Sequence, residues 1–433
     1  MIYSKYILPN GLRLITVPLP SVASATVMIL VGVGSRYEDE RVNGVTHFLE
    51  HMVFKGTKKR PSAEQLSEMI DMIGGEWNAS TGKESTAYYI KAAATHLPTM
   101  FDILSDLVTQ PLLEPAEIER EKGVIISEIA MYEDTPSRRV GELFETLLYP
   151  GSPLGWDIAG KPETVMGIKR EDFTALYRNF YHPENMVVAV AGNVKEHEVK
   201  KLAQEYLGKL KACLRRQANG KSGKAVKETF IQEEPRLYVY EKKTDQAHLV
   251  LGVRGNPRGH EERWAEEMLS SILCGGKSSR LWVQVREKRG LAYHVESSIE
   301  HYRDNGYFAI YAGVQPEKVE QTLEVILGEL RDLRQGKRGK KVTARELRKA
   351  KEFVKGHLAL GLEDTRNVAS FFGAFELLEG KVVTPTEVQK KIDAVTVRDI
   401  MEVVDAFFNA ERLNLALISP YNDGEKFKRL LVI

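Results

Sequence analysis

Two stretches of the chain align without a gap: IKREDFTALYRNFYHPENMVVAVAGNV at residues 168–194 and VTVRDIMEVVDAFFNAERLNLALISPY at residues 395–421. Asp172 meets Asp399, and Phe180 meets Phe407. Each stretch has the apolar spacing of an amphipathic helix followed by the apolar run of a buried strand. The pattern favours two copies of one αβ unit, with chance similarity of two helix–strand segments as the alternative.

The repeat extends toward the start of each half. An apolar run, a charged turn, the helix expected at residues 262–273 and the pair Gly275-Gly276 together parallel residues 26–56. Between the halves, residues 214–227 are polar and typical of a linker. We therefore expect an N-terminal domain at 1–213, a linker at 214–227 and a C-terminal domain at 228–433.

The length and composition of the chain agree with two domains and bear on its partners and its cellular compartment. The 433 residues are 43% hydrophobic and 28% charged, with a net charge of +1. Nothing in this balance selects nucleic acid or a membrane surface as a partner. The first residues show no signal or transit pattern, and we expect the two cysteines, Cys213 and Cys274, to be thiols in a reducing compartment. These features predict a cytoplasmic protein.

The clearest chemical motif is His47-Phe48-Leu49-Glu50-His51, inside a helix expected at about residues 44–54. Positions i, i+3 and i+4 share one helix face, so two imidazoles and one carboxylate converge there. Two neutral imidazoles suit Zn²⁺, and an adjacent carboxylate can take a proton from water. The order H-x-x-E-H is that of inverted zinc peptidases. A solvated helix face with an ordinary histidine pair is the alternative.

A catalytic zinc site needs a third protein ligand from another element. The helix expected at residues 115–132 offers Glu121 and Glu128, which are seven positions apart and so share a face. A carboxylate on a partly apolar helix face is costly to bury unless it binds something. Spacing alone does not choose between these two glutamates.

The chain resembles the peptidase family M16 of pitrilysin, insulysin and mitochondrial processing peptidase, in its half-length bacterial branch. The resemblance covers nearly the whole sequence and rests on these segments: LPNGLRL from Leu8, VGVGSRYE from Val31, GVTHFLEHMVFKGT from Gly44, GGEWNASTGKESTAYY from Gly74, EREKGVIISEI from Glu119 and SSRLWVQVREKRGLAY from Ser278. It implies an α+β fold of two similar αβ domains, each a mostly antiparallel sheet with helices on one face.

The resemblance also implies roles for the acidic residues. It makes Glu128 the third metal ligand beside His47 and His51, Glu121 a supporting residue and Glu50 the general base. One Zn²⁺ per chain is implied, because the second half lacks the H-x-x-E-H motif and has WAEEMLSSILCGG at residues 264–276.

Two further elements carry implied roles in substrate binding. Arg286 and Tyr293 match a family pair that faces the zinc from the opposite half and holds the substrate carbonyl, a chemically reasonable role for a cation and a phenol. Asn78, Ala79, Ser80 and Thr81 match an edge strand to which an extended peptide adds as a further strand. Without the family resemblance, the sequence would indicate only an exposed basic residue at Arg286, an aromatic residue of a strand at Tyr293 and an ordinary edge strand at residues 78–81.

We therefore expect a zinc endopeptidase that cleaves short or unfolded peptides in a closed chamber. The alternative is a non-catalytic core-type or partner subunit of the same fold, but such proteins usually lose a ligand or the base. A half-length chain with both site elements is expected to form a homodimer whose sites are shared between protomers. Neither nucleic acid nor a membrane is expected as a partner.

Overall fold

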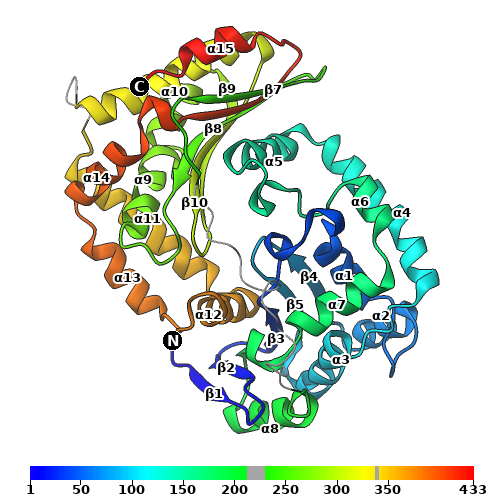
Figure 1. Ribbon diagram of the computed structural model, residues 1–433. Coiled ribbons are helices and arrows are strands. Elements are labelled where there is room, and N and C mark those ends of the chain that lie inside the picture. The colour runs from blue at the N-terminus through cyan, green and yellow to red at the C-terminus, as the bar shows by residue number, and fades with distance from the viewer. Residues whose placement is uncertain (212–229, 337–340) are drawn as a thin grey trace. The chain divides into compact units, whose positions relative to one another are not determined.

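The computed structural model describes residues 1–211, 230–336 and 341–433, which form two compact units (Figure 1). The units are, first, Met1–Ala130, Trp156–Val226 and Ala359–Pro385 and, second, Met131–Gly155, Lys227–Leu358 and Thr386–Ile433. Each unit thus combines one half of the chain with a segment from the other half.

The first unit is built on a six-stranded sheet with the order β1-β2-β6-β3-β5-β4. Its strands are β1 Ser4–Ile7, β2 Arg13–Pro18, β3 Ser24–Val31, β4 Glu76–Thr81, β5 Thr86–Ala93 and β6 Met186–Gly192. Only β2 and β6 run parallel, so the sheet is mixed but mostly antiparallel. Strands β1 and β2 are consecutive in the chain and pair as an antiparallel hairpin.

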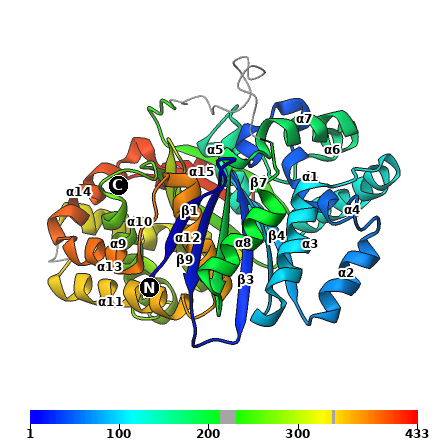
Figure 2. The ribbon, with the colours of Figure 1, turned by 90° about the horizontal axis from the view of Figure 1, so that it is seen from below.

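The helices of the first unit include those expected at about residues 44–54 and 115–132 and in the stretch 168–194. They are α1 Val45–Val53, α2 Ala63–Met72, α3 Leu97–Thr109, α4 Pro115–Glu133, α6 Pro162–Gly167, α7 Arg170–Phe180, α8 Glu196–Leu207 and α12 Thr365–Glu379. Helices α3 and α8 pack on the sheet, as Figure 2 shows from below. The aromatic ring of Phe48 on α1 meets that of Phe173 on α7 edge-on, with centroids 4.9 Å apart.

The second unit repeats this plan with five strands in the order β7-β11-β8-β10-β9. The strands are β7 Arg236–Glu241, β8 Ala247–Gly255, β9 Ala292–His301, β10 Gly306–Val314 and β11 Asn414–Ser419. The helices are α5 Pro136–Leu148, α9 Arg263–Cys274, α10 Val319–Gln335, α11 Ala344–Gly361, α13 Pro385–Ala394, α14 Val397–Phe407 and α15 Gly424–Leu430. Here too the one parallel pair, β11 with β7, sits beside antiparallel pairs.

The gapless repeat is confirmed element by element. Helix α7 and strand β6 in one stretch correspond to α14 and β11 in the other, and both strands pair in parallel with the first long strand of their unit. Both helices begin with the same cap, because the backbone N–H of Lys169 donates to Asp172 at 2.9 Å and that of Thr396 donates to Asp399 at 2.8 Å.

Each sheet also carries one helix from the other half of the chain. Helix α12 packs on β3 and β6, on the face opposite the main helical layer. It approaches so closely that a Cβ on Gly373 would lie 2.5 Å from a methyl of Leu30. In the second unit α5 packs in the same way, and a Cβ on Gly252 of β8 would lie 2.7 Å from Phe144. The expectation of helices on one face is thus completed by a single helix on the other.

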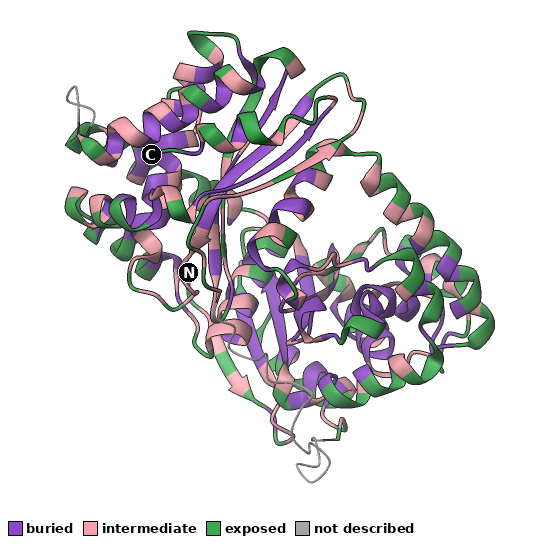
Figure 3. Ribbon diagram, turned by 45° about the horizontal axis from the view of Figure 1, so that its top comes forward, coloured by how far each residue is buried: buried purple, intermediate pink, exposed green. Residues whose placement is uncertain are grey.

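The central strands of both sheets are buried, as Figure 3 shows. Successive residues of a strand point to opposite faces, so Ile29 joins the core beneath α3 while Leu30 meets α12. Burying such a side chain contributes about 1.5–3 kcal/mol. Both faces of the central strands are therefore apolar, which explains why β3 and β6 are continuous hydrophobic runs.

The remaining expectations concern the linker, the two cysteines and the absence of a membrane-spanning helix. The linker predicted at 214–227 and Cys213 lie outside the described residues. Cys274 is a free thiol, and burial raises its pKa to about 12. None of the helices in the described ranges combines the length and apolar character that a membrane span requires.

Candidate metal centre

Helix α1 is held in place by a buried carboxylate at its first turn. Glu38 accepts hydrogen bonds from the backbone N–H of Gly44 at 2.8 Å, from that of Thr46 at 2.7 Å and from the side chain of Asn43 at 3.0 Å. An acid here satisfies N–H groups that a helix leaves unpaired and complements its dipole. Burial raises the pKa of Glu38, against these hydrogen bonds.

The start of α1 also requires a glycine. Gly44 has φ of 99°, and a Cβ there would lie 2.6 Å from the carbonyl oxygen of Ala159. The chain therefore turns sharply into α1 with its backbone against a neighbouring loop. Phe48, Leu49 and Met52 bury one side of the helix in the core, which leaves His47, Glu50 and His51 together on the other.

The second element is α4. Glu121 is 3% exposed and lies one turn from the buried Ile125, while Glu128 is half-buried. The two carboxylates share a face of α4, as their spacing predicts, and both contact α1 side chains.

His47, His51 and Glu128 bring one ligand atom each to within 4.8 Å of one another. Oε2 of Glu128 lies 3.6 Å from Nε2 of His47 and 3.3 Å from Nε2 of His51. Ligands held about 2.1 Å from a tetrahedral zinc ion lie about 3.4 Å from one another. Two imidazoles and one carboxylate at this separation fit Zn²⁺, and three ligands leave one position open.

Glu121 orients the ring of His51. Its Oε1 accepts from Nδ1 of His51 at 2.9 Å, so Nδ1 carries a hydrogen, and Nε2 of the same ring faces Oε2 of Glu128 at 3.3 Å. Burial lowers the pKa of His51, but the hydrogen bonds to the two glutamates outweigh it and raise the pKa to about 9. The position between these residues therefore attracts positive charge.

Glu121 itself remains ionised. Burial raises the pKa of Glu121, yet His51 and Lys55 outweigh burial and lower the pKa below its ordinary value. The ammonium of Lys55 lies 2.6 Å from its second oxygen. Sequence spacing did not choose between the two glutamates, but their contacts differ. Glu128 faces Nε2 of both imidazoles, whereas Glu121 contacts only Nδ1 of His51.

Glu50 is half-buried beside these residues. Its Oε2 accepts a hydrogen bond of 2.5 Å from the hydroxyl of Thr81 on β4. Burial raises the pKa of Glu50, against the lowering effects of Thr81 and His51, and the charge of Glu128 adds to the rise. A carboxylate with a raised pKa is a better proton acceptor near neutral pH.

The strand β4 ends the described sheet of the first unit, since it pairs only with β5. Asn78, Ala79, Ser80 and Thr81 lie on it, with residues 78 and 80 exposed and residues 79 and 81 half-buried. These four residues lie on an edge strand, as the sequence analysis expected. The contact of Thr81 with Glu50 was not predicted. No local pattern signals it, because the two residues come from different elements.

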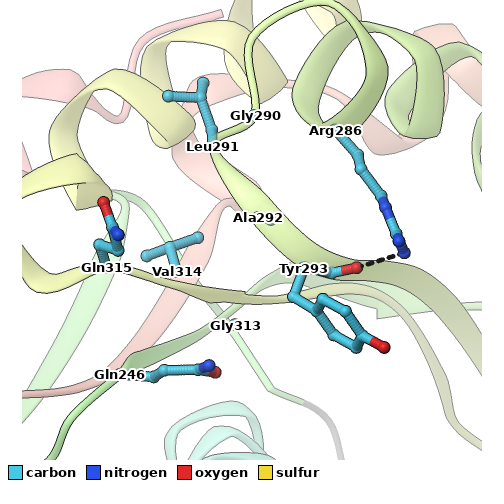
Figure 4. A pocket seen from close by; sticks show the side chains of 9 residues that line it. All are labelled: Gln246, Arg286, Gly290, Leu291, Ala292, Tyr293, Gly313, Val314 and Gln315. Atoms are coloured by element: carbon cyan, nitrogen blue, oxygen red, sulfur yellow. Dashed lines mark hydrogen bonds between the residues drawn. The ribbon is translucent and has the colours of Figure 1, made fainter.

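Arg286 and Tyr293 lie in the second unit, next to each other (Figure 4). Nη1 of Arg286 donates to the carbonyl oxygen of Tyr293 at 2.6 Å, and the guanidinium lies 4.8 Å from the Tyr293 ring centroid and 4.4 Å from that of Trp282. The Tyr293 side chain is 76% exposed. Both residues line a hollow of about 420 Å³ with Gln246, Gly290, Leu291, Ala292, Gly313, Val314 and Gln315.

Comparison with known families gives two matches that divide the chain. Residues 13–161 match the model of insulinase, peptidase family M16, and residues 167–354 match the model of the peptidase M16 inactive domain. The three donors and Glu50 fall in the first match, and Arg286 with Tyr293 in the second.

Curated relatives match over almost the full length. One is named an uncharacterized zinc protease of Streptomyces coelicolor; it is 38% identical over 418 residues, 96% of this chain and 90% of that protein. Another is named uncharacterized zinc protease YmxG of Bacillus subtilis; it is 36% identical over 416 residues, 96% of this chain and 98% of that protein.

A solved structure described as a protease from Helicobacter pylori shares the fold. It is 25% identical with a TM-score of 0.88, covering 97% of this chain and 99% of that chain. A second, described as a peptidase M16 inactive domain from Pseudomonas fluorescens, is 17% identical with a TM-score of 0.84, and its likeness concerns the fold alone.

Proposed function

The chain belongs to peptidase family M16, and from this premise we propose that it is a zinc-dependent endopeptidase that hydrolyses short or unfolded peptides with water activated by Glu50. The observation that carries the proposal is the convergence of His47, His51 and Glu128 within 4.8 Å beside the carboxylate of Glu50. The recognition of the family from the sequence motifs is confirmed, as is the α+β fold of two similar domains.

The three donors would hold one Zn²⁺ per chain, with Glu121 fixing the ring of His51. The bound ion supplies a Lewis acid that polarises oxygen atoms and makes a water easier to deprotonate. Glu121 would act on the metal only through His51, and the loss of such an outer partner weakens metal binding less than the loss of a ligand.

Glu50 is the proposed general base. Its carboxylate takes a proton from the attacking water as the oxygen bonds to the peptide carbonyl carbon, and then delivers that proton to the departing amine nitrogen. Thr81 holds the carboxylate by its hydroxyl. Removal of a group in this role typically lowers the rate by about 10² to 10⁴.

The substrate peptide would be held by hydrogen bonds between its backbone and strand β4 and by polar side chains that contact its carbonyl oxygen. An extended peptide can pair with the open side of β4 at Asn78–Thr81, which gives sequence-tolerant affinity and excludes compact domains. Arg286 and Tyr293 offer a cation and a phenol that stabilise the carbonyl oxygen as negative charge develops on it. In this proposal the pair acts on the site of a second protomer in a homodimer, and the enzyme works in the cytoplasm.

A direct experiment uses an unstructured peptide of a few tens of residues and a stable folded protein as parallel substrates. The peptide should be cut by the zinc-loaded protein, left intact after chelator dialysis, and cut again when Zn²⁺ is returned, while the folded protein survives. A zinc-loaded protein that cuts neither substrate would support the non-catalytic subunit instead. Rapid cutting of the folded protein at core sites would contradict recognition of extended chains.

A further inference from the structure

A second group of metal-ligating side chains lies in the second unit, at the loop between β8 and α9. His260, Glu262 and Glu266 bring one ligand atom each to within 4.8 Å of one another. Helix α9 takes the place in this unit that α1 takes in the first, but it lacks the H-x-x-E-H motif. None of these three residues is part of the catalytic machinery proposed above.

Asn256, at the loop that follows β8, holds the two carboxylates together. Its side-chain nitrogen donates to Oε2 of Glu262 at 2.8 Å and to Oε1 of Glu266 at 2.7 Å. Nδ1 of His260 lies 3.6 Å from Oε2 of Glu262. Amide nitrogen and oxygen exchange places by a simple rotation, so the same side chain can present its oxygen as a fourth ligand.

Glu266 is the unusual member of the group. It is 0% exposed, and its Oε2 has no hydrogen-bond donor among the described residues. Burial raises the pKa of Glu266 to about 7, and the charges of Glu262 and Glu267 add to the rise, against the lowering effects of Asn256 and of the charge of Arg263. A buried carboxylate is costly unless a cation or a proton accompanies it.

A second histidine, His301, lies beside the buried carboxylate of Glu266. Nδ1 of His301 lies 3.1 Å from the backbone carbonyl oxygen of Asn256. A carbonyl oxygen only accepts, so Nδ1 carries the hydrogen and Nε2 of the neutral ring is an acceptor. That Nε2 lies 3.8 Å from Oε2 of Glu266. A proton on Nε2, or a cation bound at the carboxylate of Glu266, would remove the repulsion between these two acceptor atoms.

We propose that His260, Glu262 and Glu266 form a second binding site for a divalent transition-metal ion, separate from the catalytic centre. Two carboxylates and an imidazole suit Zn²⁺ or Mn²⁺ better than Mg²⁺, which prefers oxygen ligands and keeps its water. His260 and Glu262 are half-buried at the start of α9, so the ion enters from solvent and its charge offsets that of the buried Glu266. The site ties the β8–α9 loop to its helix.

The test requires a protein whose first centre no longer binds metal, so all variants carry His47→Ala with Glu128→Gln. Full-length protein is dialysed against micromolar ZnCl₂ or, separately, MnCl₂, and bound metal is measured by mass spectrometry alongside the thermal unfolding midpoint. We expect about one ion per chain and a higher midpoint with metal than with chelator.

The first variant that removes a ligand of the site is His260→Gln; because His260 is half-buried in a loop, this change should leave the fold intact. The second is Glu266→Gln, which replaces a buried carboxylate. Both should abolish retention and the metal-dependent rise of the midpoint. Glu261→Gln, an exposed neighbour outside the group, is the matched control and should bind as before. Absence of bound metal in the parent, or equal retention in His260→Gln, would overturn the proposal in favour of a proton shared by Glu266 and His301.

Discussion

The hydroxyl of Thr81 on the edge strand β4 donates a hydrogen bond of 2.5 Å to the carboxylate of Glu50 on α1. This bond connects the strand proposed to pair with substrate to the residue proposed to activate water. It also stabilises the ionised form of a carboxylate whose pKa is raised by burial. We therefore propose that Thr81 positions the carboxylate of Glu50 in addition to forming part of the strand.

Replacing Thr81 should move the pH dependence of peptide cleavage. Activity requires ionised Glu50, so it falls as the pH drops through the pKa of Glu50. Without the Thr81 hydrogen bond the pKa rises further, and the acid limb of kcat/KM should shift to higher pH. A hydrogen bond to a charged group is worth about 1.5–3 kcal/mol, so a shift of about one pH unit or more is expected in Thr81→Val.

The conservative variant Thr81→Ser keeps the hydroxyl and should keep the wild-type profile. An acid limb at the same pH in Thr81→Val and wild type would show that the hydrogen bond does not act on the titrating base. A uniform loss of activity at all pH values would point instead to damaged substrate binding.

The two glutamates of α4 should differ in metal retention. Glu128→Gln removes a carboxylate oxygen that faces both imidazoles, so zinc should be lost readily. Glu121→Gln removes only the partner of His51 Nδ1 and should weaken metal affinity about 10- to 100-fold, the usual cost of an outer-partner mutation. Metal content after dialysis against a graded chelator separates the two. Earlier loss from Glu121→Gln would mean that the roles are exchanged.

The cap on α1 should matter for stability. Glu38→Ala leaves the backbone N–H groups of Gly44 and Thr46 buried without their acceptor. We expect the free energy of unfolding to fall by about 2–4 kcal/mol, measured by urea denaturation of the metal-free protein. Asp39→Ala, an exposed neighbour, is the control and should change it by less than about 0.5 kcal/mol. Equal effects of the two substitutions would contradict the capping role.

A mixture of two inactive variants tests whether the site is shared between protomers. One carries Glu50→Gln, the other Arg286→Ala with Tyr293→Phe. If the Arg286/Tyr293 pair acts on the partner's metal centre, a mixed dimer contains one complete site, and cleavage should recover after subunit exchange. Failure to recover, with mixed dimers verified by differential tags, would place the pair in its own chain's site.

Much of the fold and part of the site could be predicted from the sequence because they rest on local patterns. The spacing of His47, Glu50 and His51 puts them on one face of any helix, and the aligned repeat gave matching helices and strands. Spacing left Glu121 and Glu128 equal, because residues on one helix face differ only in which neighbour they meet. The partner of His51 Nδ1 is a fact of packing.

Other features depend on contacts between distant segments. Nothing in the pattern of α12 or α5 tells which sheet it covers, and each packs on strands from the other half of the chain. The Thr81–Glu50 contact likewise joins separate elements. An acidic residue shortly before a glycine-started helix is a cap signal, and Glu38 could have been suspected on that ground.

The central claim is that Glu50 activates water at a site that His47, His51 and Glu128 form independently of it. Glu50→Gln tests it most directly, because the amide preserves size while removing the proton acceptor. Bound zinc and cleavage of an unstructured peptide are measured on the same preparation. The account predicts zinc content equal to wild type with kcat lowered by about 10² to 10⁴. Near-normal turnover in zinc-loaded Glu50→Gln would contradict it.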